Sequence, residues 1–199
     1  MILNLLRFSA KNLHISATLI CSLFIFQNAS AQNCSGNLAA NPGFEQGTSG
    51  WNIIGGNANT STNANSGNAA LELGGTSGYN AVNQAFIGKP NTYYSLRAFV
   101  TKNNSDNTQP QAIIKFYNAS WQPINSPSER ISNSTYEELF FSRESPANTA
   151  FVGVEFVYNT NSNNQTLLVD DVCFLEEPNN SNCSISAQVV NLILSLIHI

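Results

Sequence analysis

The sequence predicts an all-β fold of two antiparallel sheets, a β-sandwich or jelly roll, on three observations. Only 10% of the 199 residues are charged while 42% are hydrophobic, so the polar surface must come from the abundant Asn, Ser, Thr and Gly, which favour turns. Short runs of β-branched and aromatic residues are separated by clusters of Gly, Asn and Pro, as expected for strands joined by turns. Heptads and a long 3.6-residue period are missing from the middle of the sequence, residues 34–177, which argues against a helical protein.

The predicted strands alternate between an apolar face and a mixed face. In the run 93–101 the apolar face holds residues 94, 96, 98 and 100, and the run 149–158 alternates in the same way. Such alternation indicates antiparallel sheets packed on a common core. The nine predicted strands are Gly36–Ala40, Trp51–Ile54, Ala69–Leu73, Ala81–Ile87, Tyr93–Thr101, Ala112–Tyr117, Glu138–Arg143, Thr149–Tyr158 and Thr166–Leu175.

The first 31 residues have the pattern of a secretory signal peptide. Arg7 and Lys11 precede an apolar run from Ile15 to Phe26, and Ala29-Ser30-Ala31 offers a cleavage site after Ala31. The run is shorter than the roughly 20 residues of a spanning helix, so we expect a secreted or cell-surface protein without membrane insertion. Cys21 would leave with the signal, and no lipid anchor is expected. The alternative is an N-terminal core helix.

Residues 178–199 differ from the body, which we place at 32–177. A polar stretch that begins at Pro178 predicts a linker, and the apolar alternation after it predicts the truncated start of a further domain. The last residues, 194–199, resemble a translated sequencing adapter and are expected to be artefactual. A short apolar tail that docks on the domain is the alternative. The body is therefore expected to be tethered to further domains of a longer chain.

The cysteines predict one disulfide bond within the body. Cys34 lies at the start of the first predicted strand and Cys173 in the last, and a secreted sandwich often places its terminal strands side by side, so we expect a Cys34–Cys173 bond. A bond between Cys173 and Cys183 across the linker is the competing prediction, because spacing alone does not fix connectivity.

Composition excludes several classes of function. The two histidines, His14 and His198, lie at the ends of the chain, so the body has no imidazole for a catalytic triad or a histidine-ligated zinc site. The net charge of −4 and the lack of a Lys/Arg cluster argue against nucleic acid as a partner.

The body contains an ordered set of short motifs, which are Asn37-Leu38, Asn41-Pro42-Gly43-Phe44-Glu45, Gly50-Trp51, Ser66-Gly67-Asn68-Ala69-Ala70-Leu71, Gln84 and Leu168-Val169-Asp170-Asp171-Val172. In this order and spacing the set resembles the cellulose- and xylan-binding jelly-roll modules of the galactose-binding-domain-like superfamily. The resemblance covers about Asn37 to Leu175 and implies a galactose-binding-domain-like jelly-roll β-sandwich that binds a polysaccharide or glycan.

The same resemblance implies a structural calcium ion held by Glu45 and Asp170. Calcium takes several oxygen ligands, so backbone carbonyl groups near Thr48 or Gly67 would supply the rest. The alternative is that the two carboxylates only accept hydrogen bonds from exposed turns.

Binding of a sugar needs flat aromatic faces and polar groups for the hydroxyls. Trp121, in the turn-like segment 118–123, is the boldest candidate, and a loop anchor over the sheet edge is its alternative. Trp51 is expected in the core, while Arg97 and Lys115 have the alternative of ordinary exposed charges. The candidate ligand-binding residues are Trp121, Tyr117, Arg97, Phe99, Tyr93, Tyr79 and Lys115.

The sequence favours a binding protein over an enzyme. A glycosidase needs two carboxyl groups about 5–9 Å apart, and the spacing of Glu72, Glu137, Glu138, Glu144 and Glu155 marks no such pair. We expect a secreted, non-catalytic carbohydrate-binding module that docks a larger extracellular protein onto polysaccharide or glycan. The alternatives are a cell-surface adhesin or spacer and the binding module of a truncated secreted glycoside hydrolase.

Overall fold

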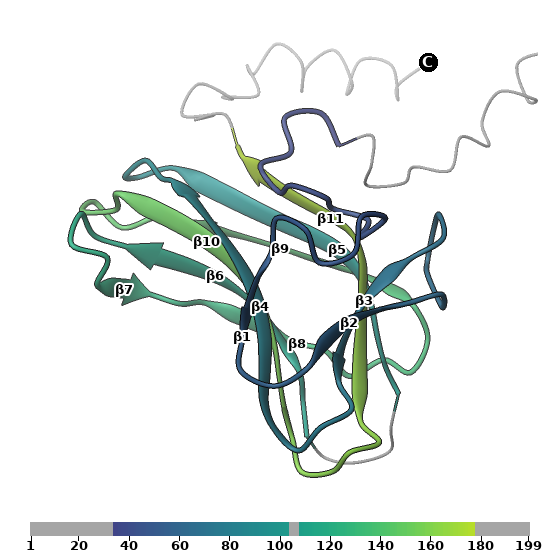
Figure 1. Ribbon diagram of the computed structural model, residues 1–199. Coiled ribbons are helices and arrows are strands. Elements are labelled where there is room, and N and C mark those ends of the chain that lie inside the picture. Colours follow the sequence, from purple (N-terminus) through teal and green to yellow (C-terminus); the bar gives the residue numbers. More distant parts are fainter. Residues whose placement is uncertain (1–33, 104–107, 178–199) are drawn as a thin grey trace, which may run out of the picture. The chain divides into compact units, whose positions relative to one another are not determined.

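The computed structural model describes residues 34–103 and 108–177, which build two antiparallel β-sheets packed face to face (Figure 1). Within these ranges there is no helix, and so none that is long and apolar enough to cross a membrane. The all-β sandwich predicted from the alternation is confirmed. The predicted signal peptide, Cys21, Cys183 and the segment 178–199 lie outside the described residues.

The strands divide between a six-stranded and a five-stranded sheet. The six-stranded sheet has the order β1-β4-β10-β6-β7, with β8 also paired to β6, and the five-stranded sheet has the order β2-β3-β11-β5-β9. The six-stranded sheet contains β1 (Asn52–Ile54), β4 (Gly78–Ile87), β10 (Phe151–Thr160), β6 (Gln111–Tyr117), β7 (Pro123–Asn125) and β8 (Ser128–Arg130); the five-stranded sheet contains β2 (Ala58–Ser61), β3 (Ala70–Gly74), β11 (Thr166–Glu176), β5 (Tyr93–Asn103) and β9 (Glu137–Glu144).

The core lies between the two sheets and follows the predicted alternation. Val152, Val154 and Phe156 of β10 are fully buried, and so are the alternate residues 94–100 of β5. Trp51 is buried with them, its ring centroid 5.2 Å from that of Phe44 and 6.1 Å from that of Phe156. The prediction that Trp51 belongs to the core is confirmed.

The strand predicted at Gly36–Ala40 is wrong. Leu38 donates one backbone hydrogen bond of 2.8 Å to Phe174, but the neighbouring ladder positions are taken by the side chain of Asn37. Its Nδ2 donates to the Val172 carbonyl at 2.8 Å, and its Oδ1 accepts from the Phe174 amide at 2.9 Å. Because an amide side chain replaces the backbone ladder, the segment lies along β11 without becoming a strand.

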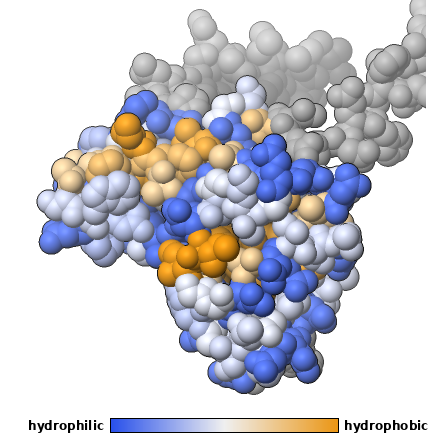
Figure 2. Space-filling model, viewed as in Figure 1, coloured by the Kyte–Doolittle hydropathy of each residue, from blue (hydrophilic) through white to orange (hydrophobic). Residues whose placement is uncertain are grey.

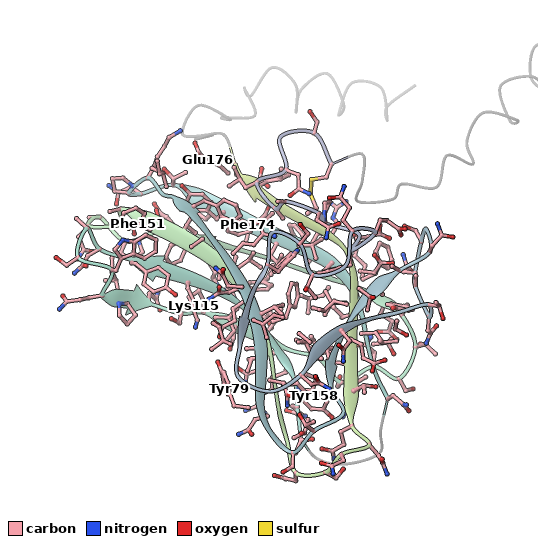
Figure 3. All side chains as sticks on the ribbon, in the orientation of Figure 1. Tyr79, Lys115, Phe151, Tyr158, Phe174 and Glu176 are labelled. Atoms are coloured by element: carbon pink, nitrogen blue, oxygen red, sulfur yellow. A yellow bond between two sulfur atoms is a disulfide. The ribbon has the colours of Figure 1, made fainter. Side chains whose placement is uncertain are left out.

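A disulfide bond joins this first segment to β11. Cys34 and Cys173 are bonded with their Cα atoms 5.9 Å apart, and the bond is drawn in yellow in Figure 3. The predicted pairing is confirmed, and the competing bond between Cys173 and Cys183 is wrong. The bond closes a sequence separation of 139 residues, which stabilises the fold by up to ~4–5 kcal/mol in the chain-entropy account.

Candidate functional site

The seven predicted ligand-binding residues lie on opposite faces of the sandwich. Tyr79, Lys115, Tyr117 and Trp121 lie on the outward face of the six-stranded sheet, which we call the Trp121 face. Figure 3 shows Phe151, Lys115 and Tyr79 along this same side, with Tyr158 and Phe174 further inside.

The other three residues, Tyr93, Arg97 and Phe99, alternate with the core positions of β5. They lie on the outward face of the five-stranded sheet, which we call the Arg97 face. A single site cannot contain all seven residues, because the core separates the two faces.

Strand register sets the order of side chains across the Trp121 face. Phe151 of β10 pairs with Tyr117 of β6 and Ile87 of β4, and two residues further on Gly153 pairs with Lys115 and Ala85. Gly153 lacks a side chain, and Tyr117 lies beside it: a Cβ atom there would be 3.7 Å from Tyr117 Cε2. The row at Gly153 therefore carries one long side chain, Lys115, between small neighbours, and the aromatic rings lie at one end of the face. Figure 2 shows hydrophobic surface at the ends of β4 and β10 and again around β1, all strands of this sheet.

The aromatic end of the face is a stack of rings that remains open to solvent. Trp121 lies 3.9 Å from Phe151 between ring centroids, with an interplanar angle of 12°. The ring centroid of Tyr117 is 5.7 Å from that of Trp121. Trp121 nevertheless keeps 53% of its surface exposed. Flat apolar faces of this kind suit the C–H side of a sugar ring.

The turn that carries Trp121 holds it in a strained backbone conformation. Its φ angle is +59°, a region that a bulky side chain adopts at a cost of roughly 1–3 kcal/mol. Asn118 closes the turn: its Oδ1 accepts hydrogen bonds from the backbone amides of Ser120 at 2.9 Å and Gln122 at 3.0 Å. Strain of this kind concentrates where a side chain must be presented in one position.

The centre of the face holds a buried ion pair. Glu155 is only 1% exposed, and its Oε2 lies 2.6 Å from Lys115 Nζ. Tyr79 donates a hydrogen bond of 3.2 Å to Glu155 Oε1. Burial, followed by the Glu155 charge, raises the pKa of Tyr79, and burial raises the pKa of Tyr117. Both phenols therefore stay protonated and able to donate at neutral pH.

Two residues of this face were not among the predicted ligand-binding residues. Phe151 completes the ring stack, and Glu155 is one of the carboxylates whose spacing marks no catalytic pair. Glu155 is buried because β10 lies between β4 and β6, so its outward side chains are flanked on both sides. The mixed alternation of Phe151, Gly153 and Glu155 was the sequence signal for a second, polar face.

The Arg97 face carries similar residue types in a different arrangement. The Nε atom of Arg97 lies 2.9 Å from Glu138 Oε1, and both side chains are about half exposed. The Arg97 guanidinium also lies 5.8 Å from the ring centroid of Phe140, itself 59% exposed. On this face the exposed pair, not a buried network, holds the guanidinium.

The two predicted calcium ligands bind the same turn. Glu45 Oε1 accepts hydrogen bonds from the amides of Asn68 at 2.8 Å and Ala69 at 3.1 Å, and the bond from Asn68 chiefly lowers the pKa of Glu45. Asp170 Oδ2 accepts from the amides of Asn65 at 2.8 Å and Ser66 at 3.0 Å. Burial is the main cause that raises the pKa of Asp170 to about 6.

Hydrogen bonds to exposed turn amides, the alternative role of these carboxylates, are thus present at Glu45 and Asp170. Within residues 34–103 and 108–177, no group of three or more Asp, Glu, His or Cys side chains is placed to hold a metal ion. A calcium ion there would need backbone carbonyl groups for most of its ligands. The calcium site stays a prediction.

Comparisons with protein-family models and with curated proteins yield no match. Solved structures do match. A structure named Family 16 Carbohydrate Binding Module-2 is 20% identical with a TM-score of 0.61, over 70% of this chain and 100% of that one. TmCBM61 in complex with β-1,4-galactotriose is 17% identical with a TM-score of 0.52, over 72% of this chain and 100% of that one.

A third match is the pair of CBM22-1 and GH10 modules of Clostridium thermocellum endo-1,4-β-D-xylanase 10B, in complex with xylohexaose. It is 13% identical with a TM-score of 0.55, over 73% of this chain and 29% of that one. At such identities the likeness establishes the fold alone. The chain therefore has the jelly-roll fold of carbohydrate-binding modules.

Proposed function

We propose that the protein is a non-catalytic carbohydrate-binding module that holds a polysaccharide or glycan on the Trp121 face. The observation that carries this proposal is the open ring stack of Trp121 and Phe151 beside the buried Lys115–Glu155 pair. The match to structures of carbohydrate-binding modules supports the same class.

The chemistry of the face suits a neutral sugar chain. A sugar ring would lie against Trp121, and its hydroxyl groups would exchange hydrogen bonds with Lys115, Glu155 and Tyr79. Because Glu155 already balances the charge of Lys115 at 2.6 Å, this centre offers directed polar groups without a net charge. The site keeps Tyr79, Lys115, Tyr117 and Trp121, adds Phe151 and Glu155, and leaves out the three predicted residues of the Arg97 face.

The carboxylates support binding without catalysis. Among the described residues of the Trp121 face, Glu155 is the one carboxylate, whereas glycoside hydrolysis needs two on either side of the scissile bond. Its partner Lys115 holds it as an ion pair. Any hydrolytic activity of a longer parent chain would therefore belong to another domain.

Retention on polysaccharides tests the proposal. The full chain is run through native gels that contain soluble xylans, β-glucans or galactans. Each polysaccharide that retards the protein is then titrated by calorimetry. We expect millimolar to micromolar binding that Trp121→Ala abolishes and that Arg97→Ala, on the opposite face, leaves within twofold. Equal loss in both variants, or no retention by any polysaccharide, would contradict the proposal, and the second result would favour a spacer or adhesin.

The biological setting extends the same proposal. We propose a secreted protein, with the signal removed after Ala31, that docks a larger extracellular chain onto its glycan. Weak affinity at one site is then compensated by tethering to other modules. The N-terminal sequence of the protein recovered from culture medium tests this, since it should begin at Gln32.

We further propose that Glu45 and Asp170 hold a structural calcium ion together with backbone carbonyl groups near Thr48 and Gly67. Support comes from the convergence of both carboxylates on the turn 65–69. The ion would fix this turn against β11, and its removal by a chelator should lower the midpoint of thermal unfolding.

A further inference from the structure

The five-stranded sheet carries a hollow that the proposed glycan site does not use. The hollow has a volume of about 330 Å³, within the range of sites for small ligands. Its floor is one row across three strands, in which Leu168 of β11 pairs with Glu72 of β3 on one side and with Thr101 of β5 on the other. Ser61 and Asn63 line one side and Ser134 lines another.

The walls of the hollow are fixed in place by hydrogen bonds. The Tyr136 hydroxyl donates to the Asn63 carbonyl at 2.7 Å, which ties the loop before β9 to the loop after β2. The Lys102 amide donates to the Asn133 carbonyl at 3.0 Å, and Asn133 Nδ2 donates to the carbonyl groups of Thr135 and Val100. A ligand would therefore meet a preformed site and would order few groups on binding.

The lining selects a neutral ligand rich in hydroxyl groups. The side chains on the outward side of the sheet include one carboxylate, Glu72, and otherwise hydroxyls, amides and Leu168. Lys102 also borders the hollow, but it pairs with the core residue Leu167, so its side chain lies on the other side of β5 from Thr101. One carboxylate provides too few oxygen ligands to hold a divalent cation. Its negative charge also repels an anionic ligand. A polyhydroxylated ring is the ligand that pairs with hydroxyls and amides while its C–H side contacts Leu168.

We propose that this hollow is a second saccharide site, which takes a single sugar ring such as a chain end or a branch. The choice of a sugar as ligand rests on the proposed function, but the site itself is independent of Trp121. Because the two sites lie on the outward faces of opposite sheets, one molecule would hold two glycan chains at once.

Amide chemical shifts of the full chain test the proposal. The ¹⁵N-labelled protein is titrated with xylose, galactose, β-1,4-galactotriose and xylohexaose. We expect at least one of these sugars to shift the amides of Glu72, Thr101 and Ser134, in the wild type and equally in Trp121→Ala.

Two variants address the hollow directly. Ser134→Trp fills it from an exposed loop and should abolish these shifts, while Ser132→Trp, two residues away and outside the lining, should keep them. Glu72→Gln, which keeps the size of the side chain, should weaken binding roughly tenfold by loss of a charged hydrogen-bond acceptor. A well-dispersed spectrum in each variant shows that the fold is intact.

The outcomes separate the two proposals. Sugar-induced shifts that occur only on the Trp121 face would overturn the second site and leave the proposed function standing. Shifts nowhere on the protein would overturn the second site, while retention in the polysaccharide gels decides the proposed function. Shifts in the hollow that persist in Ser134→Trp would also overturn the second site.

Discussion

The two outward faces of the sandwich hold similar residues and differ in how these residues are bound. Each face has exposed aromatic rings and one Lys or Arg paired with a Glu. On the Trp121 face the Lys115–Glu155 pair is 24% and 2% exposed in its side chains, whereas the Arg97–Glu138 pair is 52% and 47% exposed. Trp121 is stacked on Phe151 in a strained turn, while on the other face Phe140 contacts the Arg97 guanidinium.

This difference teaches that residue type alone does not identify a binding face. An exposed ion pair contributes about 0–1 kcal/mol and costs little to form or to lose. A buried pair costs desolvation that only precise geometry offsets, so its presence indicates a need for fixed polar groups. A tryptophan with positive φ indicates the same need for its ring.

Breaking the two ion pairs should give the largest contrast between the faces. Lys115→Met leaves Glu155 buried without its partner and should lower the free energy of unfolding by about 3–5 kcal/mol. Arg97→Met should lower it by less than about 1 kcal/mol. Urea denaturation measures both. The double variant Lys115→Met/Glu155→Gln should recover much of the loss, and similar losses in Lys115→Met and Arg97→Met would refute the distinction.

The carboxylates of Glu45 and Asp170, which accept hydrogen bonds from the turn 65–69, should give the next largest effect, which is on the pH dependence of stability. Because the folded pKa of Asp170, about 6, lies above its ordinary value of 3.8, the folded protein binds more protons than the unfolded chain between these values. Without calcium, the contribution of Asp170 to stability is therefore full below its ordinary pKa of 3.8 and is lost as the pH rises through about 6. Glu45 has the opposite pH dependence. Because its pKa is lowered in the folded protein, its carboxylate stabilises the fold above pH 4.5, its ordinary pKa, and this contribution is lost at lower pH.

Calcium should reverse the pH response at Asp170, because the ion favours the ionised carboxylate. Thermal unfolding at pH 7 should move to a higher midpoint with calcium and to a lower one with chelator, and Asp170→Asn should remove most of this response. A midpoint at pH 7 that is indifferent to calcium and chelator would end the calcium proposal.

The turn around Trp121 should give a smaller effect, on binding more than on stability. Asn118→Ala removes the acceptor of two turn hydrogen bonds, and the ring should lose its fixed position, with glycan affinity about tenfold weaker. Asn118→Asp keeps the acceptor and should bind within twofold of the wild type. Calorimetry compares the two variants, and equal affinities in both would show that Asn118 does not position the ring.

Local sequence pattern predicted the strands that alternate clearly and missed those that do not. The runs 93–101 and 149–158 carry apolar side chains at every second position, so their strands and buried faces could be read directly. The short strands β2, β7 and β8 are polar and bury little, and they exist because β3 and β6 offer them a partner. Gly36–Ala40 has strand-like residues, but the side chain of Asn37 takes the ladder bonds.

The candidate site was only partly predictable for the same physical reason. Alternation shows which side chains of one strand share a face, but it does not show which sheet the strand joins. The pairing of β10 with β4 and β6 brings Tyr79, Lys115 and Glu155 together from positions up to 76 residues apart. The pairing of β5 with β9 and β11 takes Arg97 to the opposite side.

Fluorescence of Trp121 tests the central claim most directly, since the sequence has two tryptophans and Trp51 is buried. In the Trp51→Phe variant all tryptophan emission comes from Trp121. Titration with a polysaccharide that the wild type binds should shift this emission to shorter wavelength, with a midpoint equal to the calorimetric dissociation constant. Binding that leaves the emission of Trp121 unchanged would place the glycan elsewhere and contradict the account.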